Sequence, residues 1–291
     1  MTTYLSIIRP AQWVKNLFVF LPVFFGRKLL CAGCMEASAW GFAAFCLISS
    51  AIYCLNDIRD IEADRQHPVK CRRPLASGRM PVSHAWGLLA LLLAGVTSIA
   101  LVGFRSDPAA IAILAAYFLL NVLYCYWLKQ LAIVDVFVIA FGFVLRLMLG
   151  GVVCDIWLSP WIVCMTFLLS LFLAFAKRRD DVIILEEKGT LSRKSIARYN
   201  IAFMNQTLGL LGAITMVCYI IYSVSPEVED RIGSGYVYVS SVFVLAGILR
   251  YLQLTMVDRR SGSPTRVLLT DRFIQLCMAG WILFFVAVLY F

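Results

Sequence analysis

The chain has 291 residues, of which 62% are hydrophobic and only 15% are charged. A soluble domain typically has about 45–50% apolar and about 25% charged residues, so this composition excludes a soluble globular enzyme and a disordered protein. The formal net charge is +9. Because the basic residues lie between apolar runs, they indicate the cytoplasmic loops of a membrane protein and not a nucleic-acid-binding surface.

Nine apolar runs, each of about the length that crosses a bilayer, divide the chain. These runs are continuous and lack a period of two, which argues against a transmembrane β-barrel. We therefore predict an all-α integral membrane protein with nine transmembrane helices in one domain, residues 1–291. The predicted spans are 14–30, 34–55, 82–103, 108–128, 132–153, 158–176, 199–223, 235–256 and 272–290.

The distribution of Lys and Arg predicts the orientation of these helices. With the N-terminus in the cytoplasm, 21 of the 26 basic residues lie in inner segments, whereas the outer segments hold only Arg27, Lys28, Arg105 and Arg231. The excess of basic residues inside therefore predicts a cytoplasmic N-terminus. The two long charged connections, 56–81 and 177–198, both lie on this side and are expected to carry the chemistry. They follow the second and sixth spans, a spacing that suggests a duplicated four-helix unit.

The first charged connection opens with an acidic motif that continues the second predicted span. Asn56, Asp60 and Asp64 stand four residues apart, and Asp57 lies three residues before Asp60. On a continued helix their oxygens share one face, and such oxygens suit Mg²⁺. We predict Asn56, Asp60 and Asp64 as metal ligands, and Asp57, Asp60 and Asp64 as catalytic residues. The alternative is a solvated helix end that forms ordinary ion pairs.

A basic tail, residues 67–78, follows the acidic motif directly. Arg binds phosphate through two parallel hydrogen bonds, and Lys supplies a mobile point charge. We predict that Lys70 and Arg73 bind a diphosphate held by the metal. The alternative is a positively charged anchor on the inner membrane face, which explains the basic residues but not the carboxylates beside them.

The two motifs together, Asn-x₃-Asp-x₃-Asp and Lys-x₂-Arg-Pro-Leu-x₂-Gly, cover residues 56–78. They resemble the first signature of the UbiA prenyltransferase superfamily. This resemblance implies nine membrane helices around a central cavity, an active site on the cytoplasmic side, and Mg²⁺ as a cofactor that holds a diphosphate.

The second signature of that superfamily is altered in this chain. Most members carry another aspartate motif after the sixth helix, but residues 176–181 read Ala-Lys-Arg-Arg-Asp-Asp and position 185 is Leu. A basic cluster here favours a substrate with an extra phosphate over a plain prenyl diphosphate. We predict that Lys177 and Arg178 bind a substrate phosphate, and we interpret Arg179 as an anchor at the inner membrane face.

Other stretches resemble the polyprenyl-phosphate phosphoribosyltransferase branch of the superfamily. They are residues 9–16, Tyr124-x₄-Lys129, Leu145-Arg146 with Gly150-Gly151, and residues 269–272. The resemblance implies 5-phosphoribosyl diphosphate as donor, a polyprenyl phosphate in the bilayer as acceptor, and a lipid-linked phosphoribose for cell-envelope glycans as product, made at a bacterial inner membrane. The further substrate-binding candidates are Gln12, Lys15, Asn16, Tyr124, Lys129 and Arg146.

Arg146 lies in the middle of a predicted membrane helix, where a charge is costly and usually faces the protein interior. A bound phosphate would stabilise it there, and the alternative is an ion pair with Asp135 or Asp155. For Gln12 and Asn16 the alternative is ordinary polarity at the membrane interface.

Two other functions remain open. The first is a UbiA-type aromatic prenyltransferase that uses a prenyl diphosphate to make a quinone or haem precursor. The second is a non-enzymatic transporter, which would not need the acidic motif beside the basic tail. Cys31 and Cys34 form one CxxC pattern without a second pair, so we assign them no metal or redox role. The sequence also leaves the existence of a homo-oligomer open.

Overall fold

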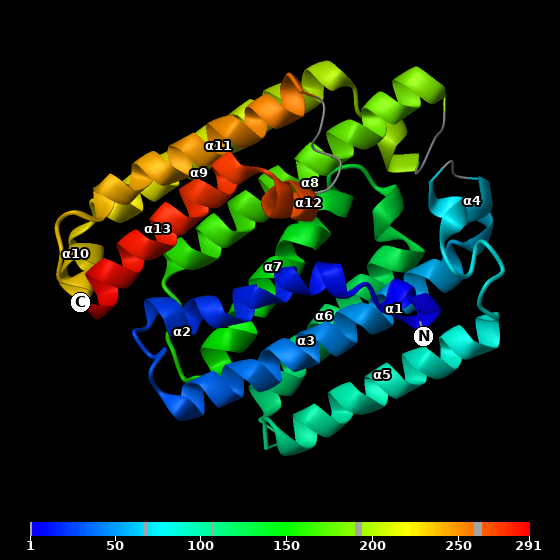
Figure 1. Cartoon of the computed structure of the whole chain (residues 1–291), viewed down its shortest axis with the longest axis horizontal. Helices are drawn as coiled ribbons and strands as arrows, with labels where there is room; N and C mark the ends of the chain where they lie inside the picture. Colours follow the sequence, from blue (N-terminus) through cyan, green and yellow to red (C-terminus); the bar gives the residue numbers. More distant parts are fainter. Residues whose placement is uncertain (1, 67–68, 106, 190–193, 259–263) are drawn as a thin grey trace. The chain divides into compact units, whose positions relative to one another are not determined.

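The computed structural model of the chain describes residues 2–66, 69–105, 107–189, 194–258 and 264–291, and every regular element in these ranges is a helix (Figure 1). The helices form two compact units. One unit consists of Met1–Leu158 with Thr190–Ser195, and the other of Ser159–Gly189 with Ile196–Phe291. His67 and Pro68 of the basic tail, and Arg193, Arg259 and Arg260 of the cytoplasmic count, lie outside the described residues.

The first unit begins with short helices and continues with four long ones. The long helix α3 packs against α5, α6, α7 and the 3-10 helix η1, and Figure 1 shows α3 and α5 side by side. The elements are α1 (Thr2–Ile8), η1 (Pro10–Phe20), α2 (Leu21–Phe25), α3 (Ala32–Arg59), α4 (Ile61–Gln66), η2 (Lys70–Arg72), α5 (Val82–Val102), α6 (Pro108–Tyr126), η3 (Leu128–Gln130) and α7 (Val134–Val153).

The second unit opens with the long helix α8. Helix α9 packs against α8 and α11, and α11 packs against α13. After α8 (Pro160–Lys188), the short helix η4 (Lys194–Arg198) passes from the first unit into the second. The remaining elements are α9 (Ile201–Ser223), α10 (Pro226–Ile232), η5 (Val237–Ser240), α11 (Ser241–Met256), α12 (Pro264–Thr270) and α13 (Arg272–Tyr290).

Eight helices in the described residues are long and apolar enough to cross a membrane, four in each unit. The four-plus-four division agrees with the spacing of the two charged segments. The predicted span 14–30 is not among the eight, because it forms η1 followed by the short α2. Pro22 has no N–H to continue a helical ladder through this run. Nine spans and a cytoplasmic N-terminus therefore stay predictions.

One apolar core of the first unit forms where α3, α5, α6, α7 and η1 meet. Phe45 and Ile48 of α3 lie fully inside it with Val19 of η1 and Leu149 of α7. Helix η1 packs closely against α7 at Gly150, where an added Cβ would lie 2.0 Å from the backbone oxygen of Val19. This close approach sets the polar residues of η1 beside those of α7.

The substitution Gly150→Ala should destabilise the first unit by about 1–3 kcal/mol, because the new methyl group meets rigid backbone and forces η1 away from α7. Gly142→Ala is the matched control in the same helix, since its Cβ would make only ordinary contacts at 3.4 Å to Tyr117 and 3.5 Å to Arg146. Thermal unfolding in detergent measures both variants. Equal melting temperatures for the two variants would contradict the close approach.

Candidate active site

The acidic motif lies where α3 ends and α4 begins. Asp60 (φ −99°, ψ 12°) ends α3, yet the bonds from Asp60 N to Asn56 O (3.0 Å) and from Asp64 N to Asp60 O (2.7 Å) carry the helical path onward. Asp57 and Asp64 are seven residues apart, which is about two helical turns and brings them to one side. The four side chains therefore form two pairs, where the sequence predicted a single row.

Asp57 and Asp64 form the first pair and share the cation of Arg73. One Arg73 nitrogen, Nη1, donates to Asp57 Oδ1 at 3.1 Å and to Asp64 Oδ2 at 2.7 Å, and both carboxylates are buried. Burial raises the pKa of the Asp64 carboxyl, although the charges of Arg73 and Lys70 oppose this shift. The basic tail thus folds back onto the acidic motif, as the adjacency of the two motifs predicted.

Asn56 and Asp60 form the second pair and share the cation of Lys129. The Lys129 ammonium is ion-paired with Asp60 Oδ1 and lies 3.5 Å from Asn56 Oδ1. Helix α6 ends at Tyr126, so Lys129 follows on η3, with its side chain buried and its backbone oxygen bonded to Ser195 Oγ (3.0 Å). The half-buried Tyr124 occupies the last turn of α6.

Arg9 also belongs to this site, although the sequence did not single it out. Its Nη2 donates to Asp57 Oδ1 at 2.5 Å, and its guanidinium lies 5.0 Å from the centre of the Tyr53 ring. The backbone at Arg9 is left-handed (φ 54°, ψ 63°), which is strained for a residue with a side chain. In the sequence, Arg9 could have been found as a site residue from its position at the start of the polar stretch 9–16.

Arg146 lies inside the first unit and is only 5% exposed. It donates to Asn16 Oδ1 (2.8 Å), the Gly142 oxygen (2.6 Å) and the Tyr117 hydroxyl (2.9 Å), which are all neutral. None of these bonds is the alternative ion pair with Asp135 or Asp155.

Asn16 is buried, and its amide also lies 3.5 Å from Ser49 Oγ. The alternative of simple interface polarity is therefore wrong for this residue, which belongs to the interior of the first unit. Gln12 and Lys15, on the same helix η1, are half-buried.

In the second unit, α8 continues to Lys188, so the loop predicted to begin at residue 177 is wrong, and residues 177–188 are helical. The charged residues do not break the helix because backbone bonding tolerates polar side chains, and the apolar stretch 182–185 follows them. Lys177 is exposed, whereas Arg178 is buried and ion-paired with Asp181 Oδ2 at 3.0 Å, one turn later.

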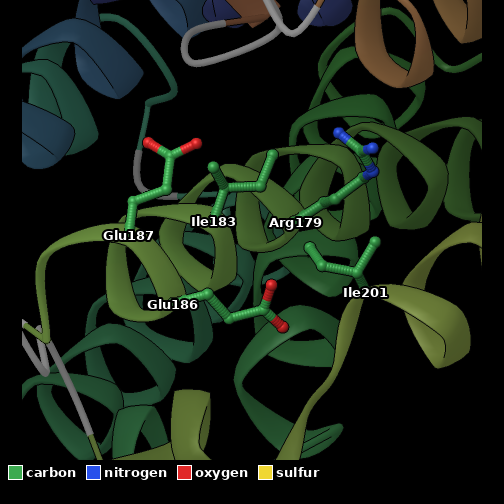
Figure 2. Close-up of a pocket in the computed structure, with 5 residues that line it drawn as sticks. All are labelled: Arg179, Ile183, Glu186, Glu187 and Ile201. Carbon is green, nitrogen blue, oxygen red and sulfur yellow. The ribbon is translucent and has the colours of Figure 1, made fainter.

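The interpretation of Arg179 as a membrane-face anchor is also wrong. Arg179 is 3% exposed and donates to Asn205 Oδ1 (2.7 Å) and to the backbone oxygen of Thr255 (2.6 Å). It therefore joins α8 to α9 and α11. Figure 2 shows it beside a cavity of about 240 Å³ with Ile183, Glu186, Glu187 and Ile201.

The donor chemistry of the first unit fits Mg²⁺ as a partial ligand set. Among the residues that the structure describes, no three or more His, Cys, Asp and Glu side chains group closely enough to hold an ion. However, Mg²⁺ takes one or two carboxylates and completes its shell with water and substrate phosphates. Either oxygen pair meets that need, and Arg9, Arg73 and Lys129 stand beside the pairs as phosphate ligands.

The substitution Arg73→Met should lower the melting temperature, because it removes the cation that two neighbouring buried carboxylates share and leaves only the charges of Arg9 and Lys70 to offset them. Removing one partner of a buried ion pair costs about 3–5 kcal/mol, and the partial exposure of Arg73 makes a loss of about 1–3 kcal/mol the expected result. Arg72→Met is the control, because Arg72 is exposed. Thermal melts of both variants at low salt measure the difference, and equal melts would refute the bridging role.

Comparison with known proteins shows which family the chain belongs to. Residues 19–276 match the UbiA prenyltransferase family. The chain is 33% identical to decaprenyl-phosphate phosphoribosyltransferase of Mycolicibacterium smegmatis, over 99% of this chain and 92% of that protein. It is 32% identical to the protein of the same name from Corynebacterium glutamicum, over 98% and 86%.

Solved structures show the same fold. A UbiA homologue from Archaeoglobus fulgidus bound to DMAPP and Mg²⁺ has a TM-score of 0.72 and 19% identity, with 99% of each chain covered. The same homologue bound to GPP and Mg²⁺ gives 0.70 and 18%, over 99% of this chain and 100% of that one. With its apolar helices and these matches, the chain belongs to the UbiA prenyltransferase family and is a multi-pass membrane transferase.

Proposed function

We propose that this protein transfers the 5-phosphoribosyl group of 5-phosphoribosyl diphosphate to a polyprenyl phosphate, with Mg²⁺ as cofactor and release of diphosphate. The observation that carries the proposal is the grouping of carboxylates and cations at the end of α3. Similarity to named phosphoribosyltransferases over nearly the whole chain supports the choice of donor and acceptor. The lipid-linked phosphoribose would serve cell-envelope glycan synthesis, from a bacterial inner membrane with the site facing the cytoplasm.

Asn56, Asp60 and Asp64, assisted by Asp57, would hold Mg²⁺, which neutralises the diphosphate leaving group when bound. The cations that pair with these carboxylates then become available to the substrate. Arg73 and Lys129 would exchange a carboxylate for phosphate oxygens, because carboxylate and phosphate are both anionic partners of these cations. Lys70, whose charge acts on Asp64, would bind the phosphate with them. This exchange lets the site keep its charges compensated with and without substrate.

The bond between ribose C1 and the diphosphate oxygen breaks, and positive charge develops on the sugar ring as in other glycosyl transfers. An oxygen of the lipid phosphate attacks C1 from the opposite face, which inverts that carbon. This oxygen is already ionised, so the step needs no general base. Gln12, Asn16 and Tyr124 would donate hydrogen bonds to the ribose or its phosphate, and Lys177 and Arg178 would bind a substrate phosphate.

A specific observation separates this reaction from aromatic prenyl transfer. The usual second aspartate motif is altered, since Asp181 is paired with Arg178 and position 185 is Leu. Lys177 and Arg178, which stand where a second acidic motif is usual, favour a donor with an additional phosphate over a plain prenyl diphosphate.

The test is a transfer assay with purified full-length protein in detergent, Mg²⁺, a polyprenyl phosphate and radiolabelled 5-phosphoribosyl diphosphate. Label should enter the organic phase, and Asp60→Asn should lower the rate at least a hundredfold because it removes a metal-binding charge without changing shape. Chelation should abolish transfer, whereas Arg72→Met should retain it.

Absence of transfer by folded protein would contradict the proposal. The same protein would then be assayed with prenyl diphosphates and aromatic acceptors. Activity in that assay would establish the aromatic prenyltransferase instead.

A further inference from the structure

Two cations of the first unit, the buried Arg146 and the half-buried Lys15, have no anionic partner among the described residues. All the hydrogen bonds of Arg146 go to neutral oxygens. The Lys15 ammonium makes no hydrogen bond or ion pair with any residue in the described ranges. Burying a cation without a partner is costly, so this pair differs from Arg73 and Lys129, which are ion-paired.

The charges around Lys15 increase this cost. The charged groups that act on it are Arg146 and Arg9, and both are positive. Arg9 is compensated by Asp57, at 2.5 Å. Arg9 is thus paired with the acidic motif, whereas Lys15 and Arg146 have no such partner, and uncompensated cations of this kind are expected of an anion-binding site.

The walls around Arg146 indicate what kind of anion fits. Its guanidinium carbon lies 5.1, 4.9 and 5.3 Å from the ring centres of Phe45, Tyr117 and Phe143. Ring faces stabilise a cation and also accommodate hydrocarbon. A ligand with one small anionic head on an apolar chain suits this environment, whereas 5-phosphoribosyl diphosphate is polar at every end and would lose its hydration there.

We propose that Lys15 and Arg146 form the subsite for the phosphate monoester of the acceptor lipid, separate from the acidic motif that receives the donor diphosphate. This assignment rests on the proposed function and adds which phosphate each cation binds. Arg146 retains N–H groups beyond the three in use, and the Lys15 ammonium has all three. Arg9 contacts Asp57 on the donor side.

The experiment measures equilibrium binding of farnesyl phosphate, a short polyprenyl phosphate, to the full-length protein in detergent with a chelator present. Lys15→Met should weaken this binding about tenfold or more, because a charge-assisted hydrogen bond is lost. The matched control is Lys28→Met, which removes a half-buried lysine that bonds the Cys154 oxygen. Lys28→Met should leave the affinity unchanged.

A second pair of measurements distinguishes the two subsites. Binding of 5-phosphoribosyl diphosphate with Mg²⁺ should stay within about twofold in Lys15→Met and fall at least tenfold in Asp60→Asn, while farnesyl phosphate shows the reverse. Loss of donor binding in Lys15→Met with farnesyl phosphate binding retained would overturn the assignment. A second variant, Arg146→Lys, keeps the positive charge but loses the guanidinium. Its affinity for farnesyl phosphate should also fall, and a thermal melt confirms that it is folded.

Control ligands identify what the subsite recognises. Farnesol has the apolar chain without the charge, and inorganic phosphate has the charge without the chain. Each should bind much more weakly than farnesyl phosphate. Equal binding of farnesol, or equal binding of inorganic phosphate, would refute a lipid-phosphate subsite. If farnesyl phosphate binds through Lys15 but no phosphoribosyl transfer occurs, the subsite stands and the proposed reaction fails.

Discussion

Charge compensation in an apolar surrounding is the constraint on which the first unit depends. Asp57 and Asp64 are buried beside a membrane-length helix, where unpaired carboxylates would be strongly unfavourable. Arg73 can reach both only if the basic tail folds back, and Lys129 can reach Asp60 only if η3 follows α6 closely. The connecting segments at this end of the unit therefore have their conformation set by the carboxylates of α3.

The two units meet the same constraint in different ways. The first long helix of each unit carries charged residues near its C-terminal end, α3 in the first unit and α8 in the second. On α3 the carboxylates collect cations from other segments. On α8 the arginines are the buried groups: Arg178 pairs with Asp181 of its own helix, and Arg179 bonds neutral oxygens of α9 and α11. This contrast agrees with a duplicated four-helix unit in which the two copies use their charged helix ends differently.

Most of the helices could be predicted from the sequence, because the apolar runs that cross a membrane are continuous and local. The end of α8 could not be predicted in this way, because the charged residues from Lys177 onward end the apolar run. The helix itself depends on backbone hydrogen bonds, and these continue through Lys177. Within the site, the spacing of the acidic motif indicated which residues gather. Arg9 escaped prediction, and the bond between Asn16 and Arg146 was not foreseen, because the partners Asp57 and Arg146 lie 48 and 130 residues away in the chain. Such contacts depend on packing and leave no local pattern.

Buried cations in this protein fall into two physical classes, and the difference bears on how a charged substrate could bind. Arg73 and Lys129 have carboxylate partners, so an incoming phosphate must compete with those partners, and a metal ion that takes the carboxylates releases the cations. Arg146 has only dipoles and ring faces around it, so its charge remains largely uncompensated. A phosphate that reaches Arg146 therefore meets no competing anion at its bonds. Binding at the acidic motif then depends on exchange of partners, whereas binding near Arg146 depends on direct attraction in a low-dielectric interior, where Coulomb interactions are strong.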